Sequence, residues 1–120
     1  MNILVVFIGG GLGSLARYLL SFLFNSSSTT SFPIGTFLSN ILACIVLGIL
    51  IGYHNKHALS GNISLLLMTG FCGGFSTFST FSSETLTLIQ NQQVMLALSY
   101  VAISMLCGLV AIYLGIKFMN

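Results

Sequence analysis

The sequence predicts an all-α integral membrane protein with four membrane-spanning helices, the third of them broken near its middle. Of its 120 residues, three are lysine or arginine and one is acidic, while 56% are hydrophobic. Soluble domains carry about 25% charged residues, so a surface this poor in charge indicates a membrane protein. The length allows one compact bundle, because each span takes about 20 residues. The net charge of +2 is too small to indicate nucleic-acid binding.

Four apolar runs place the spans within a single domain, residues 1–120. The first covers about residues 2–24 and ends in a polar cluster at 25–31. The second starts at Pro33, where proline favours the first turn of a helix, and ends near residue 53, before a predicted short loop at 54–57. The third covers about 63–90 and the fourth about 94–118. Four helices with short loops must alternate up and down.

The third run is too long for a straight span. Its roughly 28 residues would measure about 42 Å as one helix, against a hydrocarbon core of about 30 Å. Tilt could absorb the excess, but Gly70, Gly73 and Gly74 lie near the middle and are followed by serine and threonine. Hydroxyl groups can satisfy a freed backbone, which in a membrane must be buried in protein or line a cavity. We therefore predict a broken third helix.

The loop charges do not fix one orientation. Lys56 and Lys117 lie on one side and Arg17 leans toward the other, whereas the positive-inside rule needs a clear bias. Such a chain could insert both ways, and two copies could pair about an axis in the membrane plane, the relation that inverted repeats build into one chain. Proteins with one orientation and a weak bias also exist.

Residues 73–84 are the strongest candidate for a functional site. They hold two glycines, six hydroxyl side chains, three phenylalanines and Glu84, the only acidic residue. Polar residues inside a membrane are functional-site hypotheses by default. Phe78, Phe81, Ser82 and Thr85 share one helical face, and the positive ring edges of phenylalanine with nearby hydroxyl donors could line an anion path. The alternative is a packing stripe of phenylalanines, and an ionised Glu84 would oppose an anion.

Two other polar side chains fall inside the spans. Arg17 could snorkel to the interface or attract anions to an aqueous vestibule. Asn40, about 10 Å into its helix, could join helices or donate to an anion. The close glycine pairs Gly9/Gly13 and Gly48/Gly52 indicate tight helix packing.

No catalytic constellation is visible, so the chain is not predicted to be an enzyme. His54 and His57 share a loop, with no acid or thiol suited to complete a triad or a metal site. Cys44, Cys72 and Cys107 fall in apolar stretches without metal-ligand spacing, which favours small buried apolar residues.

Three motifs together resemble the CrcB/Fluc family of small fluoride channels. Residues 9–18 read GGGLGSLARY, similar to the family's G-G-x-x-G-[AS]-x-x-R-Y. Residues 33–40 read PIGTFLSN, similar to P-x-G-T-[LF]-x-x-N. Residues 70–81 read GFCGGFSTFSTF, similar to G-F-x-G-G-x-T-T-F-S-T-F, with Ser76 in place of threonine. The resemblance covers essentially all four spans.

The resemblance implies an antiparallel, dual-topology homodimer with two pores, each lined by both subunits. By position, Asn40 would donate to fluoride and Phe78 and Phe81 would present ring edges to it. Arg17 would lie near the vestibule. Backbone carbonyls of Gly73 and Ser76 from both chains would hold a structural sodium ion on the dimer axis. The remaining residues on or near the polar track would be Ser79, Ser82, Glu84 and Thr85 in the third span and Tyr100 and Ser104 in the fourth.

The function implied by the resemblance is passive export of cytoplasmic fluoride through a multi-pass protein of a prokaryotic plasma (inner) membrane. Its partners would be fluoride, membrane lipid and an inverted second copy. Undissociated HF crosses membranes and ionises inside, and a selective channel drains the trapped fluoride. Two alternatives remain: a small dual-topology multidrug or cation exporter, which in that class depends on a glutamate in the first span, and a non-transporting tetraspan scaffold.

Overall fold

The predicted architecture of four membrane helices is confirmed. The computed structural model describes residues 2–25 and 31–119, so most of the polar cluster expected at 25–31 lies outside the described residues. Four helical segments are long and apolar enough to cross a membrane, which makes the chain an all-α, multi-pass membrane protein. The three unbroken helices are α1 (Asn2–Asn25), α2 (Ile34–His57) and α6 (Val94–Met119), and the third span covers Gly61–Gln90.

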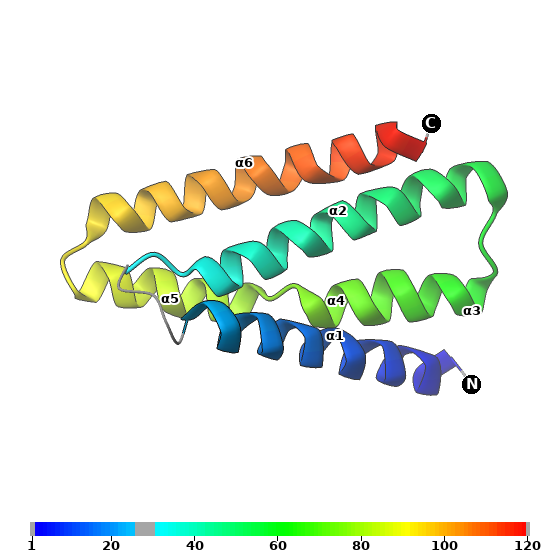
Figure 1. The fold of residues 1–120 in the computed structure, drawn as a ribbon, viewed down its shortest axis with the longest axis horizontal. Coiled ribbons are helices and arrows are strands. Elements are labelled where there is room, and N and C mark those ends of the chain that lie inside the picture. Colours follow the sequence, from blue (N-terminus) through cyan, green and yellow to red (C-terminus); the bar gives the residue numbers. More distant parts are fainter. Residues whose placement is uncertain (1, 26–30, 120) are drawn as a thin grey trace.

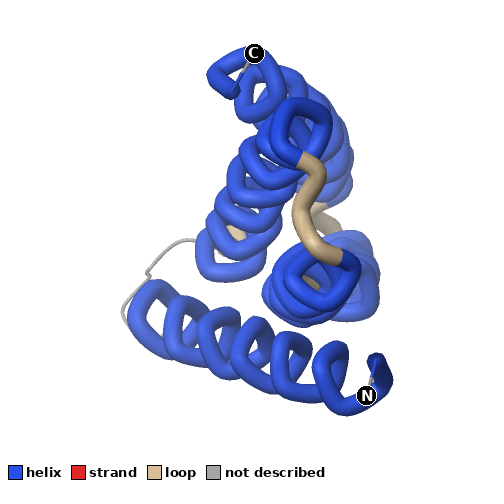
Figure 2. The backbone as a smooth tube through the Cα atoms, turned by 90° about the vertical axis from the view of Figure 1, so that its right-hand side faces the viewer, coloured by secondary structure: helices blue, strands red, loops and turns tan. Residues whose placement is uncertain are grey.

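The spans alternate in direction, so the two ends of the described chain lie at the same end of the bundle (Figure 1). The third span lies between α1 on one side and α2 with α6 on the other, and the end-on view shows α1 crossing beneath the rest (Figure 2). The closest pairings are α2 with α6, and α1 with the first half of the third span. This arrangement leaves the middle of the third span within reach of α1 and α2.

The third span is broken, as predicted, but the break lies past the glycines. It begins with α3 (Gly61–Ser64), a π-helix η1 (Leu65–Cys72) and a short α4 (Gly73–Phe75), and resumes as α5 (Phe78–Gln90). Ser76 and Thr77 between them are extended, with ψ of 157° and 124°. Gly73 and Gly74 are helical. Gly74 allows a close approach between helices, because a Cβ on it would collide with the Gly10 carbonyl.

The prediction of a loop at residues 54–57 is wrong. Helix α2 continues through His57 and ends at Ala58, whose φ is 49° and whose N–H donates to the His54 carbonyl at 2.9 Å. No glycine or proline interrupts residues 53–57, so the helix runs on until a left-handed residue caps it. His57 lies one turn after Tyr53, and their ring centroids are 4.7 Å apart.

Small residues bring the helix backbones together, as the glycine pairs predicted. A Cβ on Gly13 of α1 would meet the Phe71 carbonyl, and a Cβ on Gly48 of α2 would meet the Ile112 carbonyl. Helix association in lipid depends on such close packing because the apolar surroundings supply no hydrophobic drive. Gly9 and Gly52 also pack directly against the backbone of a neighbouring helix.

Candidate functional site

A groove beside the break brings together several of the predicted site residues. Its volume is about 360 Å3, and it lies between α2, the break with the start of α5, and the middle of α6. The predicted site residues that line it are Asn40, Ser76, Phe78, Phe81 and Ser104. It is also lined by Cys44, Thr77 and Met105.

Asn40 holds the broken backbone in place. Its Oδ1 accepts a hydrogen bond from the Thr77 N–H at 2.8 Å, and its Nδ2 donates to the Thr77 carbonyl at 3.4 Å. The Thr77 hydroxyl in turn caps α5 by accepting the Thr80 N–H at 3.3 Å. An amide nitrogen has two N–H donors, and Asn40 makes no further hydrogen bond within the described residues. One donor of Asn40 is therefore available to the groove.

Ser104 contributes a second available donor, from α6. Its Oγ is buried and has no hydrogen-bond partner within the described residues. A buried hydroxyl without a partner costs about 1–3 kcal/mol, so such groups in native proteins call for an explanation. Because Ser104 lines the groove, its hydroxyl can serve a ligand there.

The two phenylalanines of α5 form the aromatic part of the groove. The rings of Phe78 and Phe81 have centroids 6.1 Å apart and an interplanar angle of 37°. Phe81 also packs on the Tyr100 ring, at 5.0 Å. Phe78 is 80% exposed in the single chain. The Phe81 ring is thus held by packing against Tyr100, while the Phe78 ring is open.

Glu84 belongs to a separate hydrogen-bonded cluster one turn beyond Phe81. Thr36 Oγ1 donates to its Oε1 at 2.7 Å, and the Tyr100 hydroxyl donates to its Oε2 at 3.0 Å. Thr36 is 1% exposed and Tyr100 0%. The Tyr100 ring packs edge-on against the Phe32 ring, at 5.2 Å. Both carboxylate oxygens thus accept buried hydroxyl donors, and Glu84 and Tyr100 do not line the groove.

The other hydroxyl groups of the predicted polar track lie outside the groove. Ser79 and Ser82 are exposed on α5, and the Ser79 hydroxyl contacts that of Thr77 at 3.3 Å. The Thr85 hydroxyl donates to the Phe81 carbonyl at 2.8 Å, so its proton is already engaged within its own helix. The single chain therefore does not bring these three residues to Asn40.

Arg17 reaches the break from the opposite side. Its Nε donates to the Gly74 carbonyl at 3.2 Å. It also lines a cup of about 220 Å3 whose other lining residues all bear a hydroxyl group: Ser14, Tyr18, Ser21, Thr36, Thr77 and Thr80. Thr77 lines both the cup and the groove, so the guanidinium lies near the groove rather than in it.

The break also frees backbone carbonyls. The Thr77 N–H donates to Asn40, which leaves the Gly73 carbonyl without its ordinary helical donor. The Ser76 carbonyl accepts no backbone hydrogen bond within the described residues. Gly73 is exposed, with open space where a Cβ would be. No group of three or more histidine, cysteine or acidic residues that could hold a metal occurs among residues 2–25 and 31–119.

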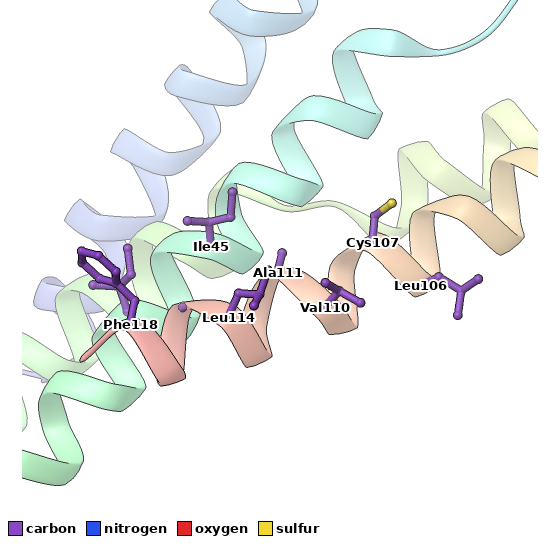
Figure 3. A pocket seen from close by; sticks show the side chains of 9 residues that line it. Ile45, Leu106, Cys107, Val110, Ala111, Leu114 and Phe118 are labelled. Carbon is purple, nitrogen blue, oxygen red and sulfur yellow. The ribbon is translucent and has the colours of Figure 1, made fainter. Parts of the chain in front are cut away.

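A second, larger groove lies between α2 and α6 and is apolar (Figure 3). Its volume is about 640 Å3, and its lining is made of Ile45, Ile49, Leu106, Cys107, Val110, Ala111, Leu114, Gly115 and Phe118. An anion needs hydrogen-bond donors in place of its water, and these side chains offer only one thiol. We therefore take the smaller groove at the break as the candidate site.

Sequence reasoning missed four residues of the groove and of the Glu84 cluster. Thr36 lies one helical turn before Asn40, so the shared face of α2 was a usable signal. Thr77 was visible as part of the hydroxyl-rich run. Cys44 and Met105 carry no pattern that distinguishes them from packing residues.

The fold and the site define a small four-span membrane protein with a donor-lined groove at a helix break. The profile of the family described as "CrcB-like protein, Camphor Resistance (CrcB)" matches residues 4–116. The chain therefore belongs to the CrcB family, as its motifs predicted.

Curated relatives match over nearly the whole chain, and each is named "Fluoride-specific ion channel FluC". The relative from Flavobacterium psychrophilum is 41% identical over 116 residues, 96% of this chain and 94% of the relative. The relative from Gloeothece citriformis is 43% identical over 116 residues, 97% and 94% of the two chains. The relative from Oceanobacillus iheyensis is 44% identical over 117 residues, 97% and 89%. These relatives are named as ion channels and not as enzymes, which agrees with the multi-pass membrane protein that the four spans define.

Proposed function

We propose that the chain is a fluoride-selective channel that passively exports fluoride as an antiparallel homodimer with two pores. The observation that carries the proposal is the groove at the break, where the donors of Asn40 and Ser104 meet the rings of Phe78 and Phe81. Relatives named as fluoride-specific channels match over nearly the whole chain.

The groove suits a small anion that must both enter and leave. Fluoride gives up water only where other donors replace it, and the free N–H of Asn40 and the hydroxyl of Ser104 are two such donors. Phenylalanine edges carry a partial positive charge, so the rings add attraction without a formal charge. No lysine or arginine lines the groove. Conduction requires binding that is favourable yet weak enough for release, and this chemistry meets both needs.

An inverted second copy would complete the pore. The groove of one chain is open on one side, and Phe78 is 80% exposed there. A large aromatic side chain left exposed at an open groove is the arrangement expected of half a site. Two copies related by an axis in the membrane plane would present two equivalent grooves, hence two pores, with Ser79, Ser82 and Thr85 available to extend the polar path.

The break suits a structural sodium ion. The Gly73 and Ser76 carbonyls lack ordinary helical donors, and backbone exposed at membrane depth must be satisfied. Carbonyl oxygens are hard ligands of the kind that hard cations take. In the antiparallel dimer, the same two carbonyls from each chain would hold sodium and join the two breaks. Sodium would neutralise carbonyl dipoles there, while Asn40 keeps the break in its extended form.

The two polar clusters would serve the ends of the path. Arg17 in its hydroxyl-lined cup would raise the local concentration of anions at the vestibule. On the other side of Phe81, Thr36 and Tyr100 hold the Glu84 carboxylate by two hydrogen bonds. That geometry keeps the one acidic side chain turned away from the groove, which lowers its repulsion of fluoride.

The same geometry disfavours a cation or multidrug exporter. That class depends on a glutamate in the first span, which here has none. Glu84 is in the third span and its two oxygens are occupied. Proton-driven uptake of a cationic dye by reconstituted vesicles would favour the exporter instead.

Fluoride efflux from liposomes tests the proposal. Purified dimer should release trapped fluoride rapidly and chloride hardly at all, as a fluoride electrode and a chloride electrode would record. Folded dimer that releases no fluoride would rule out the channel. A C-terminal tag found on only one side of the membrane would rule out the antiparallel homodimer but not the channel.

A further inference from the structure

A small cavity behind the break is lined by sulfur-bearing residues that are far apart in the sequence. Its volume is about 150 Å3, and it lies between α2 and the junction of η1 with α4. Cys44 reaches it from α2, and Met68 and Cys72 from η1. The other lining residues are Ala43, Leu47, Gly73 and Ser76. Apart from Ser76, these neighbours offer no polar side chain.

The three sulfur groups are placed as possible ligands. Cys44 and Cys72 are free thiols, and Cys72 is 3% exposed. Both thiols line the same cavity, Cys44 from α2 and Cys72 from η1. Met68 lies one turn before Cys72 on the same helical segment, and its sulfur is oriented by the Ser64 hydroxyl at 3.3 Å. Two thiols and a thioether around one cavity are soft ligands, which select soft metal ions.

We propose that this cavity binds one soft metal ion, of the class of Hg(II), Ag(I) and Cu(I), between Cys44 and Cys72, with Met68 as a third donor. Hg(II) displaces both thiol protons and forms two mercury–sulfur bonds, with no change of oxidation state. The product is uncharged, which matters because a buried net charge is costly. Hard ions such as sodium and magnesium prefer oxygen ligands and would not compete.

The cavity is coupled to the groove, a step that rests on the proposed function. Cys44 and Ser76 line both the groove and the cavity. Gly73, whose carbonyl is one of those proposed to bind sodium, also lines the cavity. A metal bridging Cys44 and Cys72 would tie α2 to the end of η1 directly beside the break. Fluoride passage should therefore stop when the site is filled.

The third cysteine provides a matched control. Cys107 is an exposed thiol on α6 in the apolar groove of Figure 3 and lies outside the cavity. Cys107→Ala removes this independent thiol without touching the proposed site. The test protein is accordingly purified Cys107→Ala dimer, titrated with mercuric ion and followed by intact-chain mass and by counting the remaining reactive thiols.

The proposal predicts one mercury per chain, a mass gain of one mercury less two hydrogens, and the loss of both reactive thiols together. Cys44→Ala and Cys72→Ala in the same background should each lose this bridged product. Two mercury ions per chain, or none, would overturn the site. These stoichiometries are measured without fluoride, so they stand whether or not the chain conducts.

Flux then tests the coupling separately. Mercury should abolish fluoride efflux from Cys107→Ala liposomes, and a dithiol chelator should restore it. Unchanged efflux with the bridged product formed would overturn the coupling. Absence of efflux before mercury is added would count against the proposed function, not against the metal site.

Discussion

Replacing Ser104 by alanine should slow fluoride passage without weakening the fold. The Ser104 hydroxyl is buried and unpartnered within the described residues, so the folded protein gains nothing from it. Since an unsatisfied buried polar group costs about 1–3 kcal/mol, its removal should leave the free energy of unfolding unchanged or raise it slightly. An ordinary buried hydroxyl with a protein partner would show the opposite result.

The loss of flux follows from the donor itself. A hydrogen bond to a charged group contributes about 1.5–3 kcal/mol. If Ser104 replaces water around fluoride at the barrier, its loss should slow efflux roughly 10- to 150-fold, at 1.36 kcal/mol per decade. Ser104→Thr, which retains a hydroxyl, should keep most of the flux.

Two assays on the same samples decide the question: fluoride efflux from liposomes and denaturant unfolding in detergent. Ser99→Ala is the matched control, because Ser99 is an exposed serine of the same helix whose hydroxyl donates to the Met95 carbonyl at 2.8 Å. It should leave flux unchanged. Ser104→Ala with normal efflux, or with a clear loss of stability, would refute the reasoning.

Three further perturbations test other parts of the structure. Gly13→Ala should lower the free energy of unfolding by about 1–3 kcal/mol or more, because the added Cβ would meet backbone atoms. Gly11→Ala is its control, since a Cβ there has nothing within 4 Å. Equal unfolding midpoints for the two variants would contradict the tight contact at Gly13. Thr36→Val removes a donor from Glu84 and should cost about 1–3 kcal/mol of stability; an unchanged denaturation curve would mean that this hydrogen bond contributes nothing. Exchanging sodium for a large organic cation should abolish fluoride efflux, and full efflux after exhaustive dialysis would exclude the structural ion.

The sequence predicted the spans well because lipid imposes their length and composition. Four apolar runs gave four helices with ends close to those observed. The exception was the end of α2, where the polar tract from His54 to His57 was predicted as loop. Polarity marks where a helix leaves the membrane, but only a breaker or a cap ends the helix, and here that residue is Ala58.

The break shows a similar limit. Glycines and hydroxyl residues located it to within a few positions, yet the glycines stay helical and Ser76 and Thr77 become extended. The decisive interaction is the side chain of Asn40 with the Thr77 backbone, and a pairing across 37 residues leaves no local pattern. Likewise, Glu84 was visible as the only acidic residue, whereas its partners Thr36 and Tyr100 depend on how three helices pack.

Fluoride efflux from Phe78→Ile, compared with Phe118→Ile, tests the central claim most directly. Both phenylalanines are about equally exposed in the single chain, at 80% and 81%, but Phe78 lines the groove beside the break and Phe118 the larger apolar groove. Wild type and Phe118→Ile should drain fluoride from liposomes rapidly, while Phe78→Ile should drain it far more slowly. Equal efflux from the two folded variants would contradict a fluoride path through this groove.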